Sequence, residues 1–333
     1  MSVIFGLSLF FVSLFPLSTE TTASSNKVNF TAEAILPDNQ ISEASYYDLQ
    51  VEQGTSQNLN LQLKNTSSEK ITVKIAGNNA ITNRNGTLDY SQHGEKLLNS
   101  PSFEELISAP QSIYLNPNEE QTITFQLTIP VEGFMGTILG GFYCYEEKID
   151  DKVDTGSDGF SLTNKFAFSI GVKLRCSNEE IEPKLDISKV KPGLDNGYLT
   201  VFGTIDNPQP VLLSQLDMKA TIKEKGHKEV LHKLQQKVSL APSSSFELPI
   251  SWENEPLKAG DYQLSIQLKN ASGKKWQMEK EFQIKSSDQK LNHQAVELKE
   301  DRFADWFYVI TGLFLIVILS LVLYIVKLRH NQQ

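Results

Sequence analysis

Between residues 27 and 285 the chain alternates apolar and polar residues with a period of two, and it is rich in β-branched and aromatic side chains. This period matches a β-strand, in which successive side chains point to opposite faces of a sheet. No long stretch shows the spacing of an amphipathic helix. The pattern therefore predicts an all-β protein whose strands bury one face and expose the other.

The first part of this region contains runs of alternating residues that are separated by turns with Asn, Gly or Pro. The expected strands are 28–36, 58–64, 70–75, 122–129, 137–145 and 165–174. We expect one short helix within residues 102–108. Gly140 and Gly141 lie inside an expected strand, where they indicate a bulge or a close approach of another part of the chain.

The second part repeats the plan, and seven short strands in about 100 residues are typical of an immunoglobulin-like sandwich. The expected strands are 185–189, 198–206, 216–224, 229–240, 246–252, 262–269 and 276–284. Tyr262, after the stretch 257–261 (LKAGD), matches a tyrosine corner, in which the phenol hydroxyl ties a connection to the sandwich. We interpret that tyrosine as structural.

A charged segment with a proline, residues 177–183, interrupts the alternation and has the composition of a linker. The sequence thus predicts two tandem immunoglobulin-like β-sandwich domains, at residues 27–176 and 181–285. The polar stretch 286–305 carries charges of both signs and is expected to be a stalk.

Both ends of the chain are strongly apolar. Residues 1–23 have the apolar core and the small residues of a secretory signal peptide, although no Lys or Arg precedes Lys27. An uncleaved N-terminal anchor is the alternative. Residues 306–326 carry no formal charge, and as a helix they would span about 31 Å, the thickness of a bilayer core. We expect a C-terminal transmembrane helix, with residues 327–333 as a basic cytoplasmic tail and residues 24–305 outside the cell.

Charge and cysteine content exclude two classes of protein. With 31 Lys and Arg against 40 Asp and Glu, the chain lacks the basic surface that nucleic acid requires. Only Cys144 and Cys176 are present, so this is not a disulfide scaffold. An antiparallel pairing of 137–146 with 166–175 would place residue 144 opposite about residue 170, which leaves Cys176 out of register and favours free thiols.

No catalytic, metal-binding or cofactor-binding motif stands out. The side chains of the adjacent carboxylate pairs at 104–105 and 119–120 are expected to diverge as they do on a strand, so neither pair makes a general acid and its base. The histidines lie in polar contexts and are expected to be solvated, and the acidic loop 146–158 lacks the ligand order of a calcium site. We expect no enzyme, with a wall-processing or carbohydrate-active accessory subunit as the alternative.

The first domain is notable for its amides and hydroxyls beside tyrosines. Such groups bind neutral sugars and peptidic amides by directional hydrogen bonds and by stacking on aromatic faces. The alternative for any one Asn or Thr is that it only builds a tight turn. The candidate binding residues are Asn39, Gln40, Tyr46, Thr82, Asn83, Asn85 and Tyr90.

Several stretches resemble the WxL-interacting proteins of low-GC Gram-positive bacteria. In the first domain these are 34–40 (AILPDNQ), 46–49 (YYDL), 54–57 (GTSQ), 80–83 (AITN) and 136–141 (GTILGG), and in the second domain 241–246 (APSSSF) and 257–262 (LKAGDY). The resemblance implies an N-terminal peptidoglycan-binding domain and a second domain that binds host ligands. It also implies partnership with secreted proteins whose WxL domains attach to the wall. The two cysteines are outside the family pattern.

These expectations combine into a cell-surface adaptor. The first domain would bind peptidoglycan, and the second would bind WxL-domain proteins or, as an alternative, host extracellular-matrix proteins. A WxL partner is physically easier to reach, because the second domain adjoins the membrane beneath a thick wall. A purely structural stalk or a signalling receptor is a third hypothesis, but the tail 327–333 is too short to hold a signalling domain.

Overall fold

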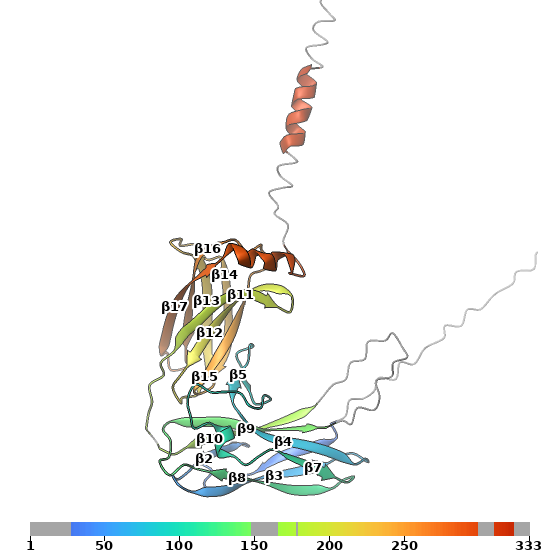
Figure 1. The fold of residues 1–333 in the computed structure, drawn as a ribbon, viewed down its shortest axis with the longest axis vertical. Coiled ribbons are helices and arrows are strands. Elements are labelled where there is room, and N and C mark those ends of the chain that lie inside the picture. Colours follow the sequence, from blue (N-terminus) through green and yellow to red (C-terminus); the bar gives the residue numbers. More distant parts are fainter. Residues whose placement is uncertain (1–27, 148–165, 178, 299–309, 323–333) are drawn as a thin grey trace, which may run out of the picture.

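The computed structural model describes residues 28–147, 166–177, 179–298 and 310–322, and it shows an all-β protein with two sandwiches in tandem (Figure 1). The expected signal peptide 1–23, the basic tail 327–333 and most of the acidic loop 146–158 lie outside the described residues. The all-β prediction is confirmed.

The first sandwich consists of a three-stranded sheet packed on a five-stranded sheet. The smaller sheet has the order β1 (Phe30–Ile35), β3 (Ser56–Asn65), β8 (Glu120–Thr128). The larger has the order β2 (Tyr47–Gln50), β10 (Ala167–Arg175), β9 (Thr137–Glu146), β4 (Ile71–Asn79), β7 (Gln111–Leu115). All pairings within these two sheets are antiparallel except that of β2 with β10, which is parallel.

Aromatic rings fill the space between these sheets. Phe142 lies at the centre, with ring centroids 4.8 Å from Phe125 and 5.9 Å from Phe103. Phe103 opens the short helix α1 (Phe103–Leu106), whose first turn is closed by a capping box between Ser102 and Glu105. The expected short helix is therefore confirmed, and its aromatic residue belongs to the core.

The second sandwich has one sheet of three strands and one of four. The first is β11 (Asp186–Asp195), β12 (Tyr198–Asn207), β15 (Ser244–Ser251). The second is β14 (His232–Leu240), β13 (Leu213–Glu224), β16 (Gly260–Lys269), β17 (Lys275–Ile284). All seven strands correspond to those expected from the sequence. The Tyr262 hydroxyl donates to the Lys258 carbonyl oxygen at 2.9 Å, which confirms the tyrosine corner.

The segment after β17 packs on the second sandwich. Residues Ser286–His293 form a 3-10 helix, η1. Leu291 contacts the core, the Asn292 side chain accepts from the Leu257 N–H at 2.9 Å, and the Val296 N–H donates to the Gly197 carbonyl oxygen. The first residues of the segment expected as a stalk thus lie against the domain.

A hairpin of the first domain lies against the second (Figure 1). It comprises β5 (Ile81–Thr82) and β6 (Leu88–Asp89), neither of which was expected from the sequence. The Thr82 hydroxyl donates to the Ser239 carbonyl oxygen at 3.0 Å and accepts from the Ala241 N–H at 2.9 Å. The Ser239 N–H donates to the Gly86 carbonyl oxygen at 2.7 Å. Backbone and side-chain hydrogen bonds therefore join the two sandwiches.

Both cysteines are free thiols, as expected from their spacing. Cys144 lies opposite Phe168 and not residue 170, because β9 and β10 pair two residues out of the expected register. Burial raises the pKa of the Cys144 thiol to about 12.

At the C-terminal end, residues 310–322 are helical, and their apolar side chains are exposed. Among the described residues, no helix has the length and apolar character needed to cross a membrane. The expected transmembrane segment 306–326 extends beyond the described helix at both ends.

Candidate functional site

A groove of about 840 Å³ opens on the first domain where β1, β10, the chain just before β2 and the end of the β5–β6 hairpin approach one another. Its margin reaches the second domain at Leu212 and Ser214. Other lining residues are Ala32, Glu33, Ala34, Leu36, Ser45, Tyr46, Leu88, Tyr90, Leu139, Phe168, Ser169, Ile170, Gly171 and Lys173. Two of the candidate binding residues, Tyr46 and Tyr90, are thus brought together.

The two tyrosines meet over a glycine of β10. A methyl group placed on Gly171 would lie 3.7 Å from the Tyr90 hydroxyl oxygen and 3.8 Å from Cβ of Tyr46. Tyr46 is 41% exposed, so its ring is available to a ligand. The absence of a side chain at Gly171 lets both tyrosine side chains approach the strand backbone.

Tyr90 is the more buried of the two tyrosines. Its ring packs on Gly141, where an added Cβ would come within 2.8 Å of the ring. Burial, together with the nearby Tyr46, raises the pKa of Tyr90 to about 12. Its hydroxyl therefore remains a hydrogen-bond donor over the physiological pH range. Gly140 faces the opposite side and lies under Phe103, so the expected close approach at the glycine pair is confirmed.

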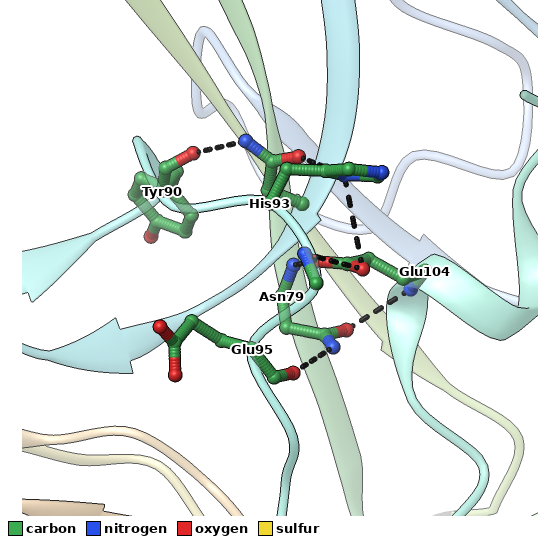
Figure 2. A network of polar contacts seen from close by, with 7 residues as sticks. Asn79, Tyr90, His93, Glu95 and Glu104 are labelled. Carbon is green, nitrogen blue, oxygen red and sulfur yellow. Dashed lines mark hydrogen bonds and ion pairs between the residues drawn. The ribbon is translucent and has the colours of Figure 1, made fainter. Parts of the chain in front are cut away.

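A polar network holds Tyr90 in place (Figure 2). The Asn78 amide donates to the Tyr90 carbonyl oxygen at 2.7 Å, and its oxygen contacts Nδ1 of His93 at 2.9 Å. Asn79 and Glu104 exchange hydrogen bonds, and Glu104 also accepts from the Gly94 N–H. Asn78 and Asn79 are almost fully buried at the end of β4. They fix the loop that follows Tyr90.

Gln40 determines where Tyr46 lies. Its amide nitrogen donates to the carbonyl oxygens of Ser42 and Tyr46 at 3.1 and 3.0 Å, and its oxygen accepts from the Asp48 N–H at 3.0 Å. One side chain thus closes the loop before β2. Asn39 acts similarly, because its amide donates to the Gln50 carbonyl oxygen and to Gln57. The two amides thus hold the loop before β2 and the last residue of β2 in place.

The loop closed by Gln40 leaves part of β10 without a neighbour. The parallel pairing with β2 begins at Val172, opposite Tyr47, and continues to Arg175. Residues 167–171 pair with β9 on one side. On the other side, the described part of the chain supplies no strand. This open edge borders the groove, because Ser169 and Gly171 of the edge are among the residues that line it.

Opposite charges flank the groove. Lys173 lies on β10 and Glu33 on β1, and both line the cavity. The ammonium of Lys173 is 3.7 Å from Asp48, a buried carboxylate that Arg175 contacts more closely, at 2.7 Å. Because Arg175 already neutralises Asp48, Lys173 can interact with a second anion.

The other three candidate residues lie on the hairpin and have structural contacts. Thr82 is buried against the second domain. The Asn83 side-chain oxygen accepts from the backbone N–H groups of Asn85 and Thr87 at 3.0 and 3.2 Å, so it closes the hairpin turn. Asn85 is exposed in that turn. A binding role for these three residues stays a prediction.

Two expectations about polar residues need correction. His232 is not solvated: it is 2% exposed, and its ring centroid lies 4.0 Å from that of Trp252. The reason is that β14 begins at this residue with its side chain facing the core. Glu104 and Glu105 lie in helix α1 rather than on a strand, and both accept hydrogen bonds from nearby backbone N–H groups.

Sequence reasoning missed Glu33, Gly171 and Lys173 as lining residues. Each belongs to an alternating strand and looks like any exposed strand residue. The only available signal was Gly171 within a predicted strand, since glycine there often marks a close approach to backbone. Among the described residues, no group of three or more His, Cys, Asp or Glu side chains could hold a metal ion.

Comparisons with protein families match two models, in the expected order. Residues 30–146 match the peptidoglycan binding domain of the WxL Interacting Protein, and residues 157–293 match its host binding domain. The second match includes β10, although this strand completes a sheet of the first sandwich. No curated protein matches the chain.

Solved structures show only remote likenesses. The YadV chaperone is 12% identical over 77% of this chain and all of its own, with a TM-score of 0.32. The E. coli chaperone DraB is 13% identical over 77% of this chain and 97% of its own, with a TM-score of 0.28. A PapD-like domain of human CEP192 is 9% identical over 53% of this chain and 99% of its own, with a TM-score of 0.29. At TM-scores this low, the likeness assigns neither a function nor a ligand to this chain.

Proposed function

Because the chain belongs to the WxL-interacting protein family, with a peptidoglycan-binding domain followed by a host-binding domain, we propose that it is a non-enzymatic cell-surface adaptor. In this proposal the first domain binds the peptidoglycan of the cell wall, and the second binds a WxL-domain surface protein. Host extracellular-matrix proteins are the other candidate ligands of the second domain. The family descriptions support the two binding activities, and the identity of the partner is our inference.

We place peptidoglycan binding at the groove between β1 and β10. The observation that carries this choice is that Tyr46 and Tyr90 meet over Gly171 in the wall of the groove. An open groove with aromatic walls and a few polar groups is the usual form of a small-ligand site. Aromatic rings also contact the less polar faces of sugars and peptides while leaving polar groups free to hydrogen-bond.

The test is co-sedimentation of the ectodomain, residues 28–298, with purified peptidoglycan. Both domains must be kept, because the hairpin is hydrogen-bonded to the second domain and β10 lies close to the boundary. Tyr46→Ala removes an exposed ring and should weaken binding by about tenfold, the effect of losing one aromatic contact of about 1.4 kcal/mol. Tyr90→Phe tests the hydroxyl with little change in packing.

A matched control is Tyr114→Ala, since Tyr114 is 77% exposed on the edge strand β7 of the same sheet. It should bind like the wild type. Equal binding by wild type and Tyr46→Ala would move the site away from the groove. Failure of the wild type to sediment would overturn the proposed function of the first domain. Release of soluble wall fragments would show that the protein is an enzyme and not an adaptor.

The finer parts of the proposal concern architecture and location. We propose that both sandwiches are immunoglobulin-like, supported in the second domain by its three-stranded and four-stranded sheets and its tyrosine corner. We also propose a single-pass membrane anchor at residues 306–326, supported by the uncharged sequence of that segment. Protease digestion of intact cells, followed by detection of the C-terminal fragment in membranes, tests the anchor.

A further inference from the structure

The open edge of β10 offers the same hydrogen-bonding groups that a neighbouring strand would use. Residues 167–171 form five positions with β9 on one side and the groove on the other. In an exposed edge strand, alternate residues point their N–H and C=O groups outward, ready to pair with an added chain. The β2 strand shows that a parallel partner fits this edge, since it occupies the next four positions.

Among the described residues, this edge has no neighbouring strand because the loop before β2 turns away from it. If residues before Tyr47 continued in the direction of β2, they would cover positions 167–171. Instead, Gln40 gathers the carbonyl oxygens of Ser42, Ala44 and Tyr46 into a closed loop. The uncovered stretch is about 17 Å long at 3.3 Å per residue, which is enough for a short extended peptide.

The side chains around the edge fit a peptide better than a neutral glycan. Lys173 on one side and Glu33 on the other suit a ligand that carries both a carboxylate and an amine. Apolar side chains that also line the groove, including Leu36 and Phe168, suit alanine methyl groups and the stem of a diamino acid. A neutral sugar chain would bring no opposite charge to Lys173 or Glu33 and no continuous row of main-chain amides to the strand edge.

We propose that the groove binds the peptide part of peptidoglycan, as an extended chain added along residues 167–171 of β10. This inference rests on the proposed function and names the component of the wall that the site recognises. Pairing with an edge uses the main-chain N–H and C=O groups of the added peptide. Lys173 binds a carboxylate of the peptide, and Glu33 binds its side-chain amine.

The first test separates the peptide from the glycan. Ectodomain 28–298 is sedimented with intact peptidoglycan and with glycan strands from which an amidase has removed the peptides. The released peptides are then titrated into the intact mixture as competitors. We expect binding to intact peptidoglycan, loss of binding to the bare glycan, and competition by the free peptides.

The outcomes distinguish this inference from the proposed function. Equal binding to intact and peptide-free wall would overturn peptide recognition while leaving wall binding in place. No binding to either would overturn the proposed function of the first domain. Binding to intact wall without competition by free peptides would also overturn peptide recognition at this site.

The second test uses variants in the ectodomain. Lys173→Gln removes the cation and should weaken binding to intact wall about tenfold, the usual effect of losing a charge-assisted hydrogen bond. Lys64→Gln is its control, because Lys64 lies on β3 and forms an exposed ion pair with Glu120 at 3.5 Å. Gly171→Val is compatible with strand geometry and fills the floor between the tyrosines, where an added Cβ makes only ordinary contacts.

Both groove variants should keep the unfolding temperature of the wild type and lose binding to the intact wall. Loss of binding only for Lys173→Gln, with Gly171→Val unaffected, would overturn an occupant along the strand edge. Weakening by Lys64→Gln as strong as that by Lys173→Gln would show a diffuse charge effect and would contradict the site.

Discussion

At the scale of single residues, two neighbouring glycines of β9 each let an aromatic ring pack closely on the backbone, on opposite faces of one sheet. Gly140 lies under the ring of Phe103 in the core, and Gly141 lies under the ring of Tyr90 at the groove. Because adjacent strand residues point to opposite faces, one dipeptide lets two aromatic rings approach the backbone. The same sheet therefore couples the packing of the core to the position of a groove residue.

Gly140→Ala should destabilise the protein. An added Cβ would lie 2.2 Å from Cδ1 of Phe103, deep in the core, so the ring would have to move. We expect the free energy of unfolding to fall by about 1–3 kcal/mol, the typical cost of overpacking. Urea denaturation measures it, with Gly171→Ala as the control, because its Cβ would meet atoms no closer than 3.7 Å. Equal stability of the two variants would contradict the packing.

The cysteines should differ in reactivity. The thiolate is the reactive form, and burial raises the pKa of Cys144 to about 12, whereas Cys176 is partly exposed. At pH 8 an alkylating reagent should modify Cys176 in the native protein and both residues after unfolding. Peptide mass spectrometry reads the result. Rapid modification of native Cys144 would show that β9 opens readily.

At the scale of elements, the β5–β6 hairpin is a first-domain segment that is stabilised by the second domain. Two-residue strands are not stable alone, and this hairpin has buried hydrogen bonds to Ser239 and Ala241. It also precedes Tyr90 directly in the chain. The position of the groove wall therefore depends on the contact between the domains.

Thr82→Val should measure the strength of this attachment. The change keeps the shape of the side chain, removes the hydroxyl, and leaves the Ala241 N–H without its partner. We expect a loss of about 1–3 kcal/mol in the free energy of unfolding, measured by calorimetry. Thr87→Val is the control, since Thr87 is exposed on the same hairpin. A loss as large for Thr87 would rule out a special role for the buried hydroxyl.

At the scale of the whole molecule, Arg84 links the two sandwiches at the tip of the hairpin. It contacts Asp195 at 3.2 Å and Glu247 at 2.7 Å, and its guanidinium lies 5.1 Å from the ring centroid of Phe202. Burial alone would raise the pKa of Glu247, but hydrogen bonds from Lys191 and Arg84 lower it below its usual value. The carboxylate is therefore ionised when the domains are in contact.

Acidification should loosen this contact. The pKa of Glu247 is lower in the folded protein than in the unfolded chain. The stabilisation that ionised Glu247 gives to the contact is therefore complete above the usual carboxyl pKa, and it is lost as the pH falls through the pKa of Glu247 in the folded protein. We expect small-angle X-ray scattering of residues 28–298 to show a larger radius of gyration for Arg84→Ala than for wild type at pH 7. The difference should shrink as the pH falls below the usual glutamate range. Identical profiles at pH 7 would show that backbone contacts alone hold the domains.

Much of the architecture could be predicted from the sequence, because period-two alternation is a local signal. The seven strands of the second sandwich, the tyrosine corner and the close approach at Gly140 and Gly141 all follow from short stretches. The family and the order of its two domains were also recognisable from sequence motifs. The free thiols followed from spacing alone, even though the register was two residues off.

The groove was decided only by tertiary structure. Tyr46 and Tyr90 were candidates from composition, but their meeting over Gly171 depends on pairings between strands far apart in the chain. The strand β2 is too short to show a clear alternation in the sequence. The edge beside it is open because Gln40 closes the preceding residues into a loop that turns away from β10. Asparagines that looked available for a ligand, such as Asn39 and Asn83, are hydrogen-bonded to backbone groups that no local pattern identifies. Local alternation determines which residues form strands, whereas long-range contacts determine which polar groups remain free.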